Sequence, residues 1–343
     1  MIKSTRPVFC VALLSLYFLA QNLQAQDLHF SQYFNAPLLT NPANTGFEPD
    51  ADWRAGINYR DQWSGVLNNP YKTMSAWGDA QLFNDRFENG WMGIGTVILK
   101  DVAGSGNLSS TKIYGSLAYH QLMGYRSLLS GGFGIGAVNK RIDATKLTFD
   151  NQWNGKFFDV TIPNGEPFAK TSVWYFDLNA GLNYSIFPSD NVYLNAGVSV
   201  DHINMPEESF FSNSASDTKV APRYNAFLNG SFKVNEQWIV NPNAYFSMMS
   251  KATEIVAGMN AHYNLSGDGS LQLIGGLYYR LQDAFIPVIG CTVSGISVTV
   301  NYDATNSSLG SYSQTRGAYE LSLTKAGVFS VYGKNVKCPS VKF

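Results

Sequence analysis

From residue 51 onward the chain is dominated by segments in which apolar and polar residues alternate. The clearest lies at 172–184, where every second residue is apolar or aromatic: Trp174, Phe176, Leu178, Ala180, Leu182 and Tyr184. A period of two is typical of a β-strand with one apolar face. No helical spacing appears after the first 25 residues. The pattern therefore predicts an all-β protein.

The alternating segments are numerous and long. We expect about 14 of them, near 52–60, 71–83, 90–100, 109–120, 127–140, 172–184, 191–201, 222–234, 237–249, 254–265, 270–282, 285–293, 295–303 and 317–325. Tilted membrane-spanning strands need roughly 9–11 residues, whereas strands of soluble proteins average about 5–6. The lengths favour a transmembrane antiparallel β-barrel, spanning 51–326, over the alternative of a secreted β-sandwich.

Composition agrees with a barrel in a membrane. Charged residues make up 14% of the chain, against about 25% in ordinary soluble domains. No apolar run of about 18 residues follows the N-terminal region, so no spanning helix is expected. The chain from residue 26 onward, without Lys3 and Arg6, holds 22 basic against 25 acidic residues. That balance excludes a nucleic-acid-binding protein.

The first 25 residues read as a signal peptide. Lys3 and Arg6 precede an apolar stretch at 8–20, which is too short for a spanning helix, and a small residue, Ala25, stands at the cut position. We expect cleavage between Ala25 and Gln26. An uncleaved apolar anchor is the alternative.

Residues 26–50 lack alternation but are rich in aromatic side chains. Such a segment must bury them, and the barrel lumen or its periplasmic mouth offers the space. The candidate residues of this N-terminal plug are His29, Phe30, Tyr33, Phe34, Asn41 and Pro42. A flexible periplasmic tail is the alternative, since termini are disordered unless they are held. At the other end, 327–343 is expected to be a periplasmic tail.

The connections between the predicted strands differ in length in a regular way. The three longest, 141–171, 202–221 and 304–316, are the fifth, seventh and thirteenth. The even-numbered connections are short, among them the turn at 187–190. Bacterial barrels have long loops outside and short turns in the periplasm. We therefore expect all three long loops to face outward.

The longest loop carries a cluster of aromatic residues, Trp153, Phe157 and Phe158, with Trp174 just inside the next strand. Exposed aromatics are costly unless something covers them, and they often anchor protein interfaces. These three residues are our candidate partner-binding site. The alternative is a loop folded over its own barrel mouth.

Motifs for chemistry are weak. Residues 132–137 fit a GxGxxA dinucleotide fingerprint, but no helical pattern follows. Their glycines line one strand face, where they would instead let bulky neighbours or a plug approach closely. The four histidines lack metal-ligand spacing, no serine lies in a GxSxG elbow, and Glu207 and Glu208 are expected to be solvated loop residues. We predict no catalytic residues, cofactor or metal. Pairing of Cys291 with Cys338 is left open.

Several motifs also occur together and in order. They are QDLHFSQYF at 26–34, NPANTG at 41–46, NYRDQW at 58–63, PYKT at 70–73, DVAGSG at 101–106, KLTF at 146–149, AFIP at 284–287, NYD at 301–303 and ELSL at 320–323. This collinear set resembles the PorP/SprF family of the type IX secretion system of Bacteroidetes. The resemblance implies a non-enzymatic outer-membrane protein that takes part in protein export or surface attachment.

Three functional hypotheses follow. The leading one is a barrel that helps to secrete a type IX substrate or holds it at the surface, for example an adhesin. The resemblance also allows a component of the secretion machine that contacts periplasmic ring proteins. A diffusion porin is the second class of hypothesis, and a lumenal or surface enzyme is the third. In each case the other expected partner is outer-membrane lipid, and none involves nucleic acid.

Overall fold

The protein is described by a computed structural model that covers residues 29–48, 51–83, 86–87, 89–124, 126–166, 168–211, 218–308 and 310–329. The predicted signal peptide, Cys338 and most of the predicted C-terminal tail lie outside these residues.

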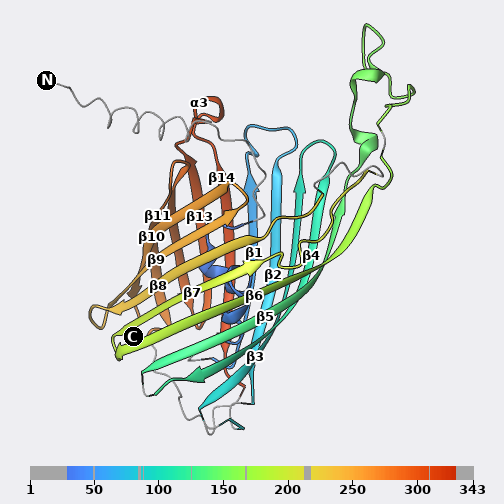
Figure 1. Ribbon diagram of the computed structural model, residues 1–343. Helices are drawn as coiled ribbons and strands as arrows, with labels where there is room; N and C mark the ends of the chain where they lie inside the picture. The colour runs from blue at the N-terminus through green and yellow to red at the C-terminus, as the bar shows by residue number, and fades with distance from the viewer. Residues whose placement is uncertain are drawn as a thin grey trace, which may run out of the picture.

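The described chain forms one closed antiparallel barrel of 14 strands, in which each strand pairs with its neighbours in sequence and β1 pairs with β14 (Figure 1). The strands are β1 (Trp53–Gln62), β2 (Tyr71–Leu82), β3 (Gly90–Ala103), β4 (Leu108–Leu122), β5 (Ser127–Arg141), β6 (Ser172–Ser189), β7 (Val192–Asp201), β8 (Arg223–Lys233), β9 (Trp238–Met249), β10 (Ala252–Asn264), β11 (Leu271–Arg280), β12 (Ala284–Val293), β13 (Ile296–Thr305) and β14 (Ala318–Gly327). The predicted fold class is confirmed, and each predicted strand corresponds to an observed one.

One predicted turn is wrong. The turn expected at 187–190 is shorter, because β6 continues through Pro188 to Ser189. The register shifts between Ile186 and Ser189, which marks an irregularity in the β6–β7 ladder. Proline has no amide hydrogen to donate, so it is tolerated in a strand at such a bulge.

The two faces of the wall differ in polarity. Outward side chains such as Leu277 and Ile289 are 57% and 69% exposed. Inward side chains such as Asn183, Asn301 and Glu320 are polar and almost fully buried. An apolar outside around a polar interior is the arrangement of a barrel in lipid. Among the described residues, no helix has both the length and the apolar character to cross a membrane.

Most strand-end aromatics face outward. Tyr59, Tyr119, Tyr184 and Trp238 are each at least one-third exposed, as expected for interfacial girdles. Trp91 is an exception: it is 3% exposed, and its indole nitrogen donates to the carbonyl of Gly46 inside the barrel. Its position at the end of the predicted strand 90–100 favours the girdle, and that prediction is wrong for Trp91.

Short helices lie outside the strands. Three belong to the N-terminal segment: η1 (Tyr33–Asn35), α2 (Pro37–Thr40) and η2 (Pro42–Asn44). The others lie in the long loops: η3 (Ala144–Lys146), η4 (Asp150–Gln152) and α3 (Gly310–Ser313). Each has at most four residues, too few to produce a helical period in the sequence.

Candidate functional site: a filled lumen and a long-loop end

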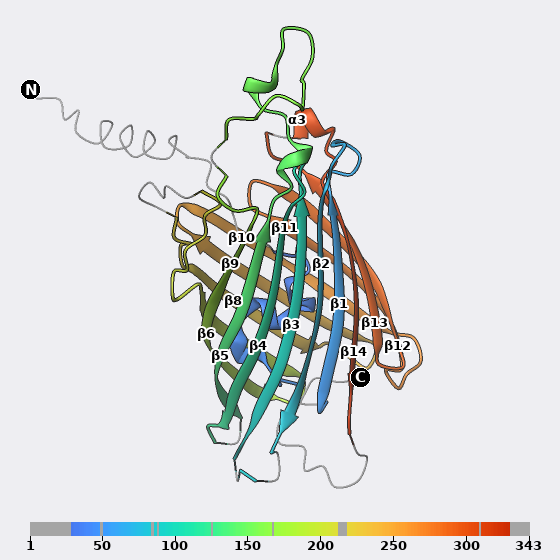
Figure 2. The same cartoon turned by 90° about the vertical axis from the view of Figure 1, so that its right-hand side faces the viewer.

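Residues 29–48, which we call the plug segment, lie inside the barrel (blue in Figures 1 and 2). The segment enters at the end that carries the long loops, where Ser31 and Gln32 contact β13 and β14. It reaches the opposite end at Gly46 and Phe47, beside β2 and β3. It therefore runs through the lumen along the barrel axis before the chain turns into β1.

A cluster of charges holds the first residues of the plug segment. The backbone amides of Ser31 and Gln32 donate to the two carboxylate oxygens of Glu320, at 2.7 and 2.9 Å. The Ser31 hydroxyl donates to Asp303 at 2.7 Å. Arg60 forms ion pairs with both carboxylates and also donates to Ser31. Charge-assisted bonds of this kind are stronger than neutral ones, so this end is firmly clamped.

His29 lies beside the same cluster. Its Nε2 is 3.3 Å from a carboxylate oxygen of Glu254, which also pairs with Arg280 at 3.1 Å. Burial lowers the pKa of His29 below its ordinary value, Glu254 acts in the opposite direction, and the nearby Arg280 and Arg60 lower the pKa further. The imidazole is therefore held mainly neutral at physiological pH.

The aromatic residues of the plug segment pack against aromatic residues of the wall. Tyr33 stacks on Tyr245 with ring centres 4.9 Å apart, and Phe34 stacks on Tyr278 at 5.2 Å. Phe30 is 5% exposed and packs in a separate apolar cluster. Burial of large rings provides much of the affinity of such a contact. The predicted aromatic residues thus cover the inner wall.

Asn41 and Pro42 sit where the wall is made of glycine. The side-chain amide nitrogen (Nδ2) of Asn41 donates to the backbone carbonyls of Leu182 on β6 and Val198 on β7, both at 3.0 Å. A Cβ added at Gly181 would lie 2.0 Å from Asn41 Oδ1, and one at Gly132 would lie 2.4 Å from the Pro42 backbone. This approach requires glycine on the wall, so the suggested purpose of the glycine run at 132–137 applies to Gly132.

The far end of the plug segment is held by buried polar groups. His120 contacts the carbonyl of Thr45 at 2.8 Å, and the Gly46 amide donates to Asp79 at 2.6 Å. The Thr45 hydroxyl donates to Ser116 at 2.8 Å. The plug segment is therefore bonded to the wall along its whole length, and it fills space that an open pore would need.

At the other functional surface, the loop between β5 and β6 rises beyond the strand ends in both overall views (Figures 1 and 2). Trp153 and Phe158 form an isolated β-bridge, with their rings 5.1 Å apart. Trp153, Phe157 and Phe158 are 50%, 58% and 45% exposed. The structure thus brings the three predicted residues together on one short turn and leaves them open to solvent.

Local hydrogen bonds shape this turn, which we call the aromatic tip (153–158). The side-chain oxygen of Asn154 accepts from the amides of Lys156 and Phe157, both at 3.0 Å. Gly155 has a φ of +95°, a conformation that L side chains rarely adopt. The turn is therefore shaped by hydrogen bonds among its own residues.

A second aromatic contact, absent from our sequence predictions, joins two long loops. Phe168 stacks on Phe211 of the β7–β8 loop at 5.2 Å, and the amides of Ala169 and Lys170 donate to the carbonyl of Phe210. A signal was present in the sequence, since Phe210 and Phe211 are adjacent aromatics in a loop. The contact fixes the base of the loop that carries the aromatic tip.

Glu208 reinforces the same junction. Its carboxylate forms an ion pair with Lys140 and accepts from the Tyr175 hydroxyl at 3.0 Å. Our expectation that the Glu207–Glu208 pair is simply solvated is therefore wrong for Glu208, because strand residues not adjacent in sequence reach it.

The remaining candidates for chemistry lie apart. His120 bonds Ser130 and the plug segment, and His262 lies 3.2 Å from Gln272. His202 is 2.8 Å from Asp177, at the start of the β7–β8 loop. Among the residues that the structure describes, no three histidine, cysteine or acidic side chains are grouped to hold a metal. The glycine run at 132–137 lies wholly in β5, which continues as a strand to Arg141, so the run does not open a helix.

These features define an outer-membrane β-barrel with a filled lumen and one end built of long, interlocked loops. The family model of the type IX secretion system membrane protein PorP/SprF matches residues 22–324. The chain belongs to that family, and its place is the outer membrane.

Solved structures show similar folds. The toluene transporter TodX of Pseudomonas putida is 12% identical, with a TM-score of 0.50 over 86% of this chain and 95% of that one. A deltaS2 mutant of the TodX monoaromatic hydrocarbon channel is 10% identical, with a TM-score of 0.51 over 84% of this chain and 93% of that one. Identities this low indicate the fold alone. No curated protein matches the chain.

Proposed function

We propose that this barrel is a non-enzymatic member of the type IX secretion system that binds an exported protein, such as an adhesin, at its long-loop end. The observation that carries the proposal is the aromatic tip: Trp153, Phe157 and Phe158 are each about half exposed on a loop that rises away from the barrel. Large aromatic residues on an ordered, protruding turn are suited to anchor a protein partner.

The filled lumen supports binding at the loop end over diffusion through the barrel. A porin needs an open lumen, whereas here the plug segment is bonded to the wall from Ser31 to Gly46. We propose neither an enzymatic step nor a cofactor, because the matching family model describes a membrane protein of the secretion system. Family membership supports association with other components of the secretion system.

The test is to replace Trp153, Phe157 and Phe158 together with alanine. The control is Tyr312→Ala, because Tyr312 is also an exposed aromatic, 85% accessible, in another long loop at the same end. We expect the triple variant to release the exported protein into the medium, while Tyr312→Ala retains it. Both barrels must remain folded, as judged by heat-modifiable migration on gels.

Two outcomes contradict the proposal. If the exported protein stays on the cells carrying the triple variant, the aromatic tip does not bind it. If export itself stops and the protein accumulates in the periplasm, the barrel acts as a component of the machine, with the ring proteins of the periplasm as its partners.

A further inference from the structure

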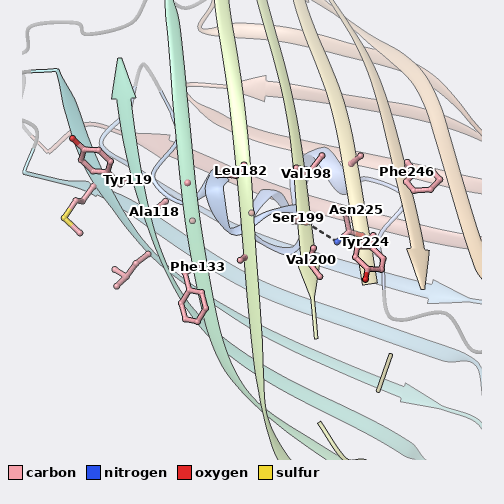
Figure 3. Close-up of a pocket in the computed structure, with 17 residues that line it drawn as sticks. Ala118, Tyr119, Phe133, Leu182, Val198, Ser199, Val200, Tyr224, Asn225 and Phe246 are labelled. Atoms are coloured by element: carbon pink, nitrogen blue, oxygen red, sulfur yellow. Dashed lines mark hydrogen bonds between the residues drawn. The ribbon is translucent and has the colours of Figure 1, made fainter. Parts of the chain in front are cut away.

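An open groove on the outer wall of the barrel, lined by residues of β3 to β9, has a volume of about 850 Å³. Six of its lining residues are Leu117, Tyr119, Phe133, Leu182, Val198 and Tyr224 (Figure 3). Each of these six side chains is at least 40% exposed on the outward face. The groove therefore lies on the surface that the membrane covers.

The groove exists because small residues occupy outward-facing positions on β5 and β6, between larger apolar side chains. Gly131 lies between Leu129 and Phe133 on the outward face of β5, and Ala180 lies beside Leu182 on β6. A Cβ at Gly131 would meet only Leu182, at an ordinary 3.5 Å. A side chain could fit at Gly131, and its absence leaves the floor of the groove open.

The lining offers no charge to a ligand. Ser199 and Asn225 contribute atoms to it, but Asn225 donates to Ser199 and to Asp201 on the lumen side. The Tyr119 hydroxyl donates to Gln121 at 2.8 Å. A charged or strongly polar ligand would lose its hydration here without compensation. A hydrocarbon chain has no hydration shell to lose, and it would fill a space that the flat bilayer leaves under-packed.

We propose that this groove is a binding site for an acyl chain of an outer-membrane lipid. The wall behind it is a single layer of backbone, and the plug segment supports that layer from inside. Asn41 donates to the carbonyls of Leu182 and Val198, two residues that line the groove. The short helices of the plug segment are visible directly behind these strands (Figure 3). The plug segment thus holds the floor in the shape that receives the chain.

The test uses the full-length barrel in phosphatidylethanolamine–phosphatidylglycerol vesicles that contain a phosphatidylethanolamine with a diazirine in the middle of its palmitoyl chain. After illumination, labelled residues are mapped by peptide mass spectrometry. We expect severalfold more label on Leu117, Phe133, Leu182 and Val198 than on Leu277 and Ile289. The latter two are at least as exposed as the four groove residues and lie on β11 and β12 of the opposite wall.

A matched pair of variants separates a bound chain from ordinary contact with lipid. Gly131→Leu fills the groove and is expected to reduce its labelling to the level of the opposite wall. Gly275→Leu adds the same side chain on β11, where no heavy atom lies within 4 Å of the added Cβ, and should leave the groove labelling unchanged. Even labelling around the wild-type barrel, or labelling that survives Gly131→Leu in a folded barrel, would overturn the proposal.

Discussion

A single methyl group added at Gly132 tests whether the plug segment is seated on the inner wall. The Cβ of Gly132→Ala would lie 2.4 Å from backbone atoms of Pro42 and Ala43. Backbone cannot rotate away as a side chain can, so the plug segment must move by about 1 Å to reach ordinary contact. The matched control is Gly134→Ala, two residues along the inward face of β5, where the nearest atom is 3.6 Å away.

The expected cost has two parts. Overpacking a well-filled interior costs about 1–3 kcal/mol. If Asn41 is pulled from the carbonyls of Leu182 and Val198, each lost hydrogen bond adds about 0.5–1.5 kcal/mol. Gly132→Ala should therefore lower the free energy of unfolding by roughly 2–6 kcal/mol, whereas Gly134→Ala should change it by less than about 1 kcal/mol.

The measurement is guanidinium unfolding of the refolded barrel, combined with hydrogen exchange of the amides at 43–46. Gly132→Ala should lower the midpoint and increase exchange at those amides. If the two variants behave alike in both measurements, the plug segment does not rest on Gly132, and the reasoning that places it against the glycine wall fails.

The remaining predictions concern processing, orientation, permeability and pH. Mass spectrometry of the mature protein should find Gln26, or its cyclised form, at the N-terminus; a retained 1–25 segment would show that the predicted signal peptide is not cleaved. An epitope inserted at Asn154 should be labelled by antibody on intact cells, and labelling only after permeabilisation would reverse the orientation inferred from loop parity. Deletion of 28–45 should raise permeability to small solutes or destabilise the barrel, because the deleted residues fill the lumen; a stable and equally impermeable variant would mean that they do neither. Because burial lowers the pKa of His29, its contribution to stability is complete above pH 6.5, the ordinary value, and is lost as the pH falls toward the lower folded value. The midpoint should therefore fall less on acidification in His29→Gln than in the wild type, and equal slopes would show that His29 does not titrate in this range.

The barrel was predictable because its signal is local and repeated. Each strand has its own alternation of apolar and polar residues, so a segment such as 172–184 can be predicted as a strand without knowing which strands it pairs with. The same rule would have placed Trp91 correctly, since Met92 and Ile94 carry the outward pattern of β3. A position at a strand end favours the girdle but does not determine which face of the wall a side chain lies on.

The path of the plug segment could not be predicted in this way. Its contacts join residues far apart in sequence, such as Ser31 with Glu320, and no periodic pattern in the sequence predicts them. What the sequence did contain were the residues that accommodate the segment: Gly132 and Gly181, which pair with each other on the inward faces of β5 and β6. The contact between Phe168 and Phe211 was hidden for the same reason, since loop pairing has no register to follow.

The central claim, that the barrel binds an exported protein through the aromatic tip, is tested most directly by site-specific photo-crosslinking on intact cells. A photoreactive amino acid replaces Phe157, and in a parallel strain it replaces Tyr312. The account predicts a covalent adduct with an exported type IX substrate from position 157 and none from position 312. Adducts at neither position, or equally at both, would contradict it.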